Sequence, residues 1–219
     1  MPRLLFEKTG NSVWMSHLDL MRLFQRAFKR ADLPLTHTQG FNPRPSVSIA
    51  LPLSVGVESH CELLDFDLDG ETVPCGEICA RLNKALVPGV RVLDVYENGS
   101  KIKHLALLRC QVSLEYDKGL PSGGADAIRE LFTREEIIVE KKGKNGPTQQ
   151  NIAPMIRRIQ ADQADASTLV LDAVICCQNP TLNPMLLGNA IAKYLPELAP
   201  DFVRCTRLEI YDNTETIFR

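Results

Sequence analysis

The chain has 219 residues, of which 44% are hydrophobic and 24% are charged, and its formal net charge is −2. This balance is typical of a folded globular protein, excludes a disordered tail, and is sufficient for one large domain or two small ones. No run approaches the ~18 consecutive apolar residues of a transmembrane helix, so we expect no membrane partner. Because the net charge is close to zero, nucleic-acid binding would require a local basic surface.

The seven cysteines do not predict a disulfide framework, because their number is odd. The N-terminal segment MPRLLFEKTG lacks the apolar core of a signal peptide, so we expect a cytoplasmic protein. Cys75 and Cys79 share one helical stripe with Ile78 and Leu82, which is typical of small core residues. A cluster-binding cysteine trio would need a third thiolate close by, so the sequence predicts no metal and no cofactor.

The first half, residues 1–99, begins with a strand at 3–8 and a helix that runs to about residue 31. Ser16 is the expected cap of that helix, with Asp19 in the capping-box position. Strand patterns follow at 34–39, 46–52 and 61–69, then a second helix from Thr72 to the VPG at 87–89, and a strand at 90–97. We interpret this half as the β-α-β-β-α-β order of a ferredoxin-like fold.

The second half, residues 100–219, repeats this order of elements. Strands are expected at 104–116, 135–142, 167–177 and 202–211, with a loop at 141–151 and short pieces around 152–162. Helices are expected at 124–132 and after Asn183 and Pro184, which are suited to a helix start. The sequence therefore predicts an α+β protein of tandem ferredoxin-like halves, with a single intimate domain as the alternative.

The first helix carries a basic stripe opposite its apolar face. The apolar face consists of Leu20, Leu23, Phe24, Ala27, Phe28 and Ala31. The stripe consists of Arg22, Arg26, Lys29 and Arg30, with Asp19 as the one nearby carboxylate. Such a row is either an ordinary solvated face or a surface that neutralises the phosphates of a nucleic-acid backbone.

Two histidines, His17 and His37, could approach one another if the first helix packs over the strand at 34–39. Two imidazoles can act as acid and base in RNA cleavage through the 2′-hydroxyl. The alternative is that His17 packs at the edge of the core and has no chemical role.

The segment Gln39-Gly40-Phe41-Asn42-Pro43-Arg44-Pro45 predicts a stiff loop. Gly40 permits a positive φ, whereas the prolines fix their own torsions and extend the residues before them. A stiff loop loses little entropy on binding. Phe41 could stack on a base or an apolar partner side chain, with Arg44 adding charge, or it could fold back over the core.

Other chemical motifs are weak in this sequence. Asp65, Asp67 and Asp69 alternate along a strand and span roughly 13 Å, which is too far for one cation, so we expect an exposed strand face. The sequence contains no phosphate-binding glycine loop, no nucleophile elbow and no zinc spacing.

The stretches SHLDLMRLFQRAFKRADLP, QGFNPRPSVSIALPLSVGVES and CELLDFDL resemble the bacterial radical-SAM-linked protein family. This is a domain of unknown function that occurs alone or joined to the C-terminus of a B12-binding radical SAM protein. The resemblance is strongest over residues 16–69 and implies a radical SAM partner rather than a reaction. The residues that carry it are Ser16, His17, Asp19, Arg22, Gln39, Gly40, Phe41, Asn42, Pro43 and Pro45.

Three hypotheses follow. The first is a non-catalytic module of a radical SAM system that presents a substrate such as structured RNA, bound by the basic stripe and the 39–45 loop. The second is an RNA-processing endonuclease, of the kind seen among CRISPR-type tandem ferredoxin-like proteins, that uses His17 and His37. The third is a protein–protein adaptor in which Phe41 is the hot spot.

Overall fold

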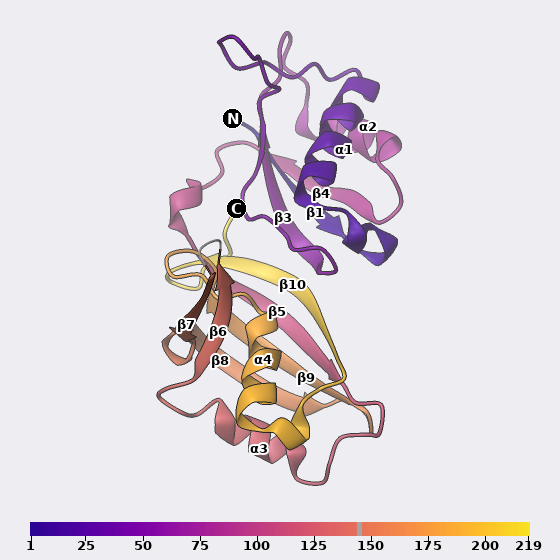
Figure 1. The fold of residues 1–219 in the computed structure, drawn as a ribbon. Helices are drawn as coiled ribbons and strands as arrows, with labels where there is room; N and C mark the ends of the chain where they lie inside the picture. Colours follow the sequence, from indigo (N-terminus) through magenta and orange to yellow (C-terminus); the bar gives the residue numbers. More distant parts are fainter. Residues whose placement is uncertain (144–145) are drawn as a thin grey trace. The chain divides into compact units, whose positions relative to one another are not determined.

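The computed structural model describes residues 1–143 and 146–219 (Figure 1). The chain divides into two compact units, Met1–Ile102 with Arg219, and Lys103–Phe218; the sequence places this boundary after residue 99. Arg219 groups with unit 1, where its carbonyl accepts a hydrogen bond of 2.6 Å from the Ser100 amide. No helix within the described residues is long and apolar enough to cross a membrane. The protein has a mixed α/β structure with four α-helices in the described residues and mainly antiparallel strands.

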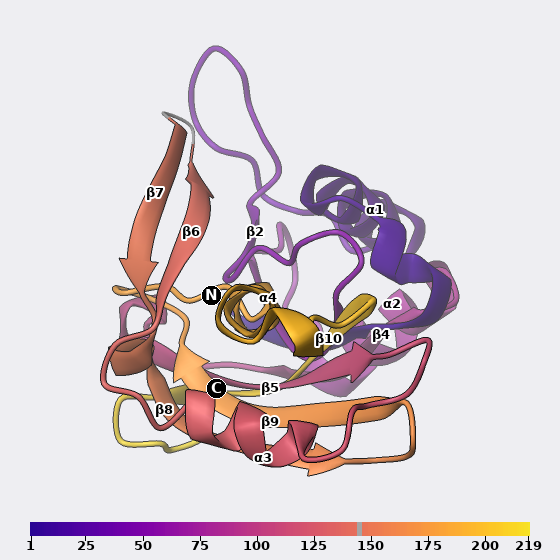
Figure 2. The same ribbon diagram turned by 60° about the horizontal axis from the view of Figure 1, so that its bottom comes forward.

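Unit 1 contains one antiparallel sheet in the strand order β4-β1-β3-β2. Its elements in chain order are β1 (Arg3–Lys8), α1 (His17–Arg30), β2 (Val47–Ile49), β3 (Glu58–Phe66), α2 (Cys75–Ala85) and β4 (Val90–Tyr96). A short 3₁₀ helix, Gly10–Trp14, connects β1 to α1. The two helices lie side by side against the sheet, as Figures 1 and 2 show.

The strand expected at 34–39 does not form. Only isolated bridges join Leu35 to Leu68 and His37 to Pro45. The Thr38 amide instead donates to the Arg44 carbonyl at 2.9 Å, which closes a loop on itself. The strand expected at 46–52 shortens to β2, because prolines lie near both of its ends and have no N–H for a ladder. Without the extra strand, the observed element order is β-α-β-β-α-β.

The core of unit 1 determines how α1 is oriented. Leu20, Phe24, Ala27 and Phe28 are buried, as the sequence predicts. Phe24 packs edge-on against Phe6 with ring centroids 4.7 Å apart, and Phe28 packs on Phe66 at 5.0 Å. Burial of each such side chain contributes roughly 1.5–3 kcal/mol. Because this face is fixed in the core, the opposite face of α1 is turned to solvent.

Unit 2 contains antiparallel strands in the order β10-β5-β9-β8. These strands are β5 (Leu105–Glu115), β8 (Ile156–Gln163), β9 (Thr168–Cys176) and β10 (Phe202–Asp212), and the helices are α3 (Gly124–Leu131) and α4 (Met185–Tyr194). Pro184 directly precedes α4, and the Asn183 side chain accepts from the Met185 amide at 3.1 Å. In both units the order is last, first, third and second, counting only the four strands named for each unit.

The segment expected as a loop at 141–151 mostly forms a two-stranded ribbon, so that interpretation is wrong for the described residues. The ribbon consists of β6 (Ile138–Gly143) and β7 (Gly146–Asn151), paired from Ile138 with Asn151 to Gly143 with Gly146 (Figure 2). Lys144 and Asn145, part of the expected basic loop, lie outside the described residues.

Candidate nucleic-acid interface

The basic stripe lies on the solvent side of α1. All four of its members, Arg22, Arg26, Lys29 and Arg30, are exposed. The helix begins as the sequence predicts, because the Ser16 hydroxyl accepts a hydrogen bond of 3.2 Å from the Asp19 amide. The cap and the buried face together fix which way the stripe points.

Three of the arginines line one groove. Arg22, Arg26 and Arg30 share this groove, of about 620 Å³, with Asp19 and Trp14. We call it the α1 groove; its remaining lining residues are Asn11, Met15, Leu23 and Val87. Successive arginines are four residues apart, so they rise along the helix axis by ~6 Å each. Such a row can contact several phosphates of one strand.

Asp19 partly neutralises the N-terminal end of the stripe. Its carboxylate accepts from the Ser16 hydroxyl at 2.7 Å and lies 3.3 Å from the Arg22 guanidinium. These contacts lower the pKa of the Asp19 carboxyl, and the hydrogen bond from Ser16 has the largest effect. The carboxyl therefore stays charged at neutral pH. The Asp19–Arg22 pair is solvent-exposed, and such pairs are weak enough for a phosphate to displace.

The other stripe residues differ in whether their side chains already have a partner within the protein. Arg30 donates to the Ala85 carbonyl at 2.6 Å. Within the described part of the chain, the side chains of Arg26 and Lys29 form no hydrogen bond or ion pair. Arg26, at the middle of the groove, is therefore the residue most available to an anion.

The basic surface continues onto α2, which sequence reasoning missed. Arg30 also lines a second hollow, of about 900 Å³, together with Arg81, Lys84 and Asp32. Arg81 pairs with Glu77 one turn earlier on α2. The signal was present in the sequence, because Lys84 lies on the side of α2 away from the buried Ile78 and Leu82, and Arg81 lies at the edge of that buried face.

Trp14 is the second feature that sequence reasoning missed. It ends the 3₁₀ helix before α1 and is 68% exposed. Its ring lies over Gly56, since a β carbon at that glycine would be 3.5 Å from the Trp14 ring. A tryptophan between a strand and a helix carries no periodic signal, so only the tertiary structure shows that it lies beside Arg22 and Arg26.

The loop at 39–45 extends into solvent (Figure 2). Phe41 is fully exposed, so the alternative in which it covers the core is wrong. The base of the loop is closed by the Thr38–Arg44 backbone bond and by the Arg44 amide, which donates to the Thr38 hydroxyl at 3.0 Å. Gly40 has a φ of +133°, a conformation that favours glycine. Gln39, Asn42 and Pro43 are also exposed, and Pro45 is half-buried.

His17 and His37 are not brought together. His17 is the first residue of α1. His37 lines a hollow of about 400 Å³ with Gln25, Phe28 and Lys29, near the other end of the helix. Eleven residues of helix separate His17 from Phe28, or ~16 Å. Within the described residues the buried Nδ1 of His17 has no hydrogen-bond partner. The expected approach of the two imidazoles is therefore wrong, although Lys29 does join the stripe to the base of the loop.

The three aspartates do not form the expected exposed face. Asp65, on the inner strand β3, pairs with Arg3 at 2.6 Å. Asp67, just after β3, accepts a hydrogen bond of 3.0 Å from the Thr36 hydroxyl. Both carboxylates therefore have polar partners within unit 1. Only Asp69 is exposed. Among the described residues no three His, Cys, Asp or Glu side chains lie close enough to hold a metal ion.

Several arginines of unit 2 are held in cross-strand or strand–loop ion pairs. Arg109 lies 2.7 Å from Asp172, and Arg204 lies 2.5 Å from Glu115. Arg158 pairs with Glu215. The hydrogen bonds from Arg109 lower the pKa of the Asp172 carboxyl. These guanidinium groups are less available to an external anion than Arg26.

A family model described as "Uncharacterized protein conserved in bacteria (DUF2344)" matches residues 2–184 of the chain. The chain belongs to the DUF2344 family. This match covers residues 2–102 of unit 1, including the α1 groove and the 39–45 loop, and most of unit 2. None of the curated proteins matches the sequence.

One solved structure shows similarity of fold for this DUF2344 member. A chain in "Crystal Structure of a Cbf5-Nop10-Gar1 Complex" aligns with 95% of it at a TM-score of 0.56 and 7% identity. The DUF2344 chain covers 48% of that chain, about half of its length. A second structure, "Crystal Structure of an Unknown Protein from Galdieria sulphuraria", aligns with 94% of this chain and 96% of its own at 11% identity, with a TM-score of only 0.26.

Proposed function

We propose that this protein is a non-catalytic module that binds structured RNA and acts with a radical SAM enzyme. The observation that carries the proposal is the α1 groove, where Arg22, Arg26 and Arg30 line one hollow. Guanidinium groups in a row bind a phosphate backbone without reading its bases. The side chain of Arg26 has no hydrogen bond or ion pair within the described chain, and it is the central contact that we propose for the phosphate backbone.

The charge around the groove supports an anionic ligand. Five basic side chains line the α1 groove and the adjoining hollow, Arg22, Arg26, Arg30, Arg81 and Lys84, against the two carboxylates Asp19 and Asp32. This local excess of positive charge exists in a protein whose formal net charge is −2. A concentrated basic patch on an otherwise acidic or neutral protein is the electrostatic feature expected of a nucleic-acid surface.

The proposal includes tandem ferredoxin-like halves. Its support is the shared strand order of the two sheets, with the β6–β7 ribbon as an insertion in unit 2. Fold alone does not specify function, so the RNA proposal rests on the α1 groove and not on this architecture.

The radical SAM partner is proposed from the sequence resemblance over residues 16–69. That stretch contains α1 and the exposed 39–45 loop, so the matching residues lie where a partner can reach them. Phe41 favours a second candidate, a protein–protein adaptor, because a fully exposed aromatic ring is suited to be an interface hot spot. An endonuclease with His17 and His37 is not proposed, because those side chains lie toward opposite ends of α1.

The test is binding of the purified protein to bulk cellular RNA at about 50 mM and about 200 mM salt. The Arg22→Ala/Arg26→Ala variant is compared with Lys101→Ala/Lys118→Ala, which removes two exposed charges elsewhere. We expect salt-sensitive binding that the first variant loses and the second keeps. Absence of wild-type binding at about 50 mM salt would contradict the RNA proposal and favour the adaptor, for which Phe41→Ala would then be tested with the radical SAM enzyme.

A further inference from the structure

Trp14 adds an exposed aromatic ring to the α1 groove, and phosphate binding alone does not require such a ring. It is the only tryptophan in the chain, it is 68% exposed, and it shares the groove with Arg22 and Arg26. A tryptophan is highly buried on average, so one left largely open beside basic side chains indicates a binding role.

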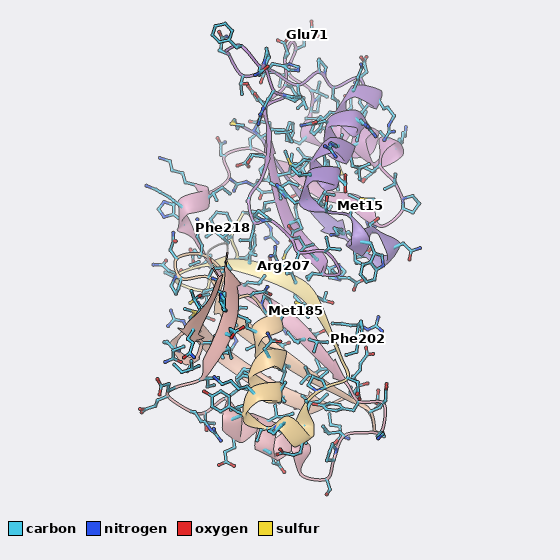
Figure 3. All side chains as sticks on the ribbon, viewed as in Figure 1. Met15, Glu71, Met185, Phe202, Arg207 and Phe218 are labelled. Atoms are coloured by element: carbon cyan, nitrogen blue, oxygen red, sulfur yellow. The ribbon has the colours of Figure 1, made fainter. Side chains whose placement is uncertain are left out.

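The backbone around Trp14 is fixed by several contacts. The Ser12 hydroxyl donates to the Pro88 carbonyl at 2.8 Å, and the Gly56 amide donates to the Val13 carbonyl at 2.9 Å. On the other side of Trp14, the Met15 carbonyl accepts from the Lys8 ammonium at 3.1 Å. Figure 3 shows Met15 where the chain enters α1. The indole ring is therefore presented from a well-anchored segment.

The Trp14 ring is largely open, with Gly56 close to one of its atoms. Gly56, in a left-handed conformation with φ of +83°, lies next to the ring, since a β carbon there would be 3.5 Å from Trp14 Cζ3. Most of the remaining indole surface is open to solvent. An open aromatic surface beside guanidinium groups is the arrangement by which proteins stack a nucleobase while they hold the adjacent phosphates.

We propose that the α1 groove binds a single-stranded segment of RNA, with one unpaired base stacked on Trp14 and the neighbouring phosphates on Arg22 and Arg26. Bases inside a duplex are already stacked on one another, whereas unpaired bases of loops and ends can stack on protein side chains. This inference rests on the proposed RNA-binding function and specifies its substrate class, an unpaired segment within a structured RNA.

The experiment uses the intrinsic fluorescence of the full chain, because Trp14 is its only tryptophan. The protein is titrated with a uridine homopolymer of about ten nucleotides and, separately, with a blunt RNA duplex of about ten base pairs. We expect the single strand to quench the emission and the duplex to leave it nearly unchanged. Affinity is measured in parallel from the anisotropy of a labelled single strand.

Three variants sharpen the test. Trp14→Ala is expected to weaken single-strand binding by roughly 5- to 150-fold, the range for loss of one stacked base, and Trp14→Phe to retain most of the affinity. The matched control is Phe202→Ala at the start of β10 (Figure 3), since Phe202 is also an exposed ring with an arginine, Arg204, 5.2 Å from its centroid. Phe202→Ala is expected to leave the affinity unchanged.

The outcomes separate this inference from the function on which it rests. Equal binding of single strand and duplex with no change in emission would overturn the stacking role and leave RNA binding intact. Unchanged single-strand affinity in Trp14→Ala would overturn it as well. If the wild type binds neither RNA at about 50 mM salt, both proposals fail. Circular dichroism of Trp14→Ala shows whether it folds, and Trp14→Phe provides the comparison if it does not.

Discussion

The arginines of α1 and those of the unit 2 sheet have the same chemistry and different surroundings. On the sheet, Arg109 and Arg204 each lie within 2.7 Å of a carboxylate. On α1, Arg22 has one exposed carboxylate at 3.3 Å, and Arg26 has no ion pair within the described residues. The number of arginines on a surface therefore does not identify a binding site. A guanidinium that has no carboxylate partner is a better indication of one.

The surroundings of two exposed aromatic side chains, Phe202 and Trp14, support the same conclusion. Phe202 has Arg204 over its ring, but that guanidinium is also bound to Glu115. Trp14 lies in a groove with three arginines that have only one carboxylate among the groove's lining residues. A ligand with both a base and phosphates could stack on Trp14 and pair with the arginines of the α1 groove. At Phe202 the charge of Arg204 is already neutralised by Glu115.

The largest expected effect compares the two arginine sets directly. Arg22→Ala/Arg26→Ala should weaken RNA binding by about 10- to 100-fold at low salt, because charge-assisted hydrogen bonds to phosphate are among the strongest a protein makes. Arg109→Ala/Arg204→Ala removes the same number of charges and should change the affinity less than about 3-fold. Filter binding or anisotropy measures both. Equal losses in the two variants would mean that only overall charge matters.

A smaller effect tests the competition at the N-terminal end of the stripe. Asp19→Asn removes the carboxylate that faces Arg22 and keeps a polar side chain near the Ser16 cap. RNA affinity should rise by about 2- to 5-fold, because Arg22 no longer has an internal anion. Asp69→Asn is the control, since Asp69 is exposed and does not line the groove. A decrease in affinity for Asp19→Asn would show that the carboxylate positions Arg22 for binding.

The sheet arginines should matter for stability instead. Arg109→Ala should lower the free energy of unfolding by about 0.5–1 kcal/mol, because Asp172 is partly buried and loses its partner. Arg26→Ala should leave that free energy nearly unchanged. Urea denaturation at pH 7 measures both variants. Similar destabilisation by the two substitutions would contradict the contrast between paired and available arginines.

The pH dependence of the Arg109 effect follows from Asp172. Arg109 lowers the pKa of this carboxyl in the folded state, so its contribution is present above the unfolded-state pKa of about 3.9 and is lost as pH falls through the folded value. The stability difference between wild type and Arg109→Ala should therefore be full at pH 6 and shrink below about pH 4. A difference that is constant down to about pH 2 would assign the effect to packing.

Local patterns in the sequence predicted much of unit 1. The Ser16 cap, the buried face of α1 and its basic stripe follow from periodicity over one helix, and all are present in the structure. The expected strand at 34–39 failed, because alternation alone does not show that Thr38 and Arg44 close a loop between them. Which segment a strand pairs with depends on the tertiary structure, and a pattern of six residues does not predict it.

The missed parts of the site depend on long-range contacts. Trp14 is placed at the α1 groove by the hydrogen bonds of its neighbours, because Ser12 donates to Pro88 and Val13 accepts from Gly56, residues far away in the chain. Arg81 and Lys84 join the basic surface because α2 packs beside α1. Conversely, His17 and His37 are only twenty residues apart in sequence, yet a helix of fourteen residues holds them apart.

The most direct test of the account is the salt dependence of binding to a defined hairpin RNA, measured for the wild type and for Arg22→Ala/Arg26→Ala. If the α1 groove holds the phosphate backbone, the logarithm of affinity falls linearly with the logarithm of salt concentration, and the variant lowers the slope by roughly 1–2. An unchanged slope, or wild-type binding that is indifferent to salt, would contradict the assignment of this groove to RNA.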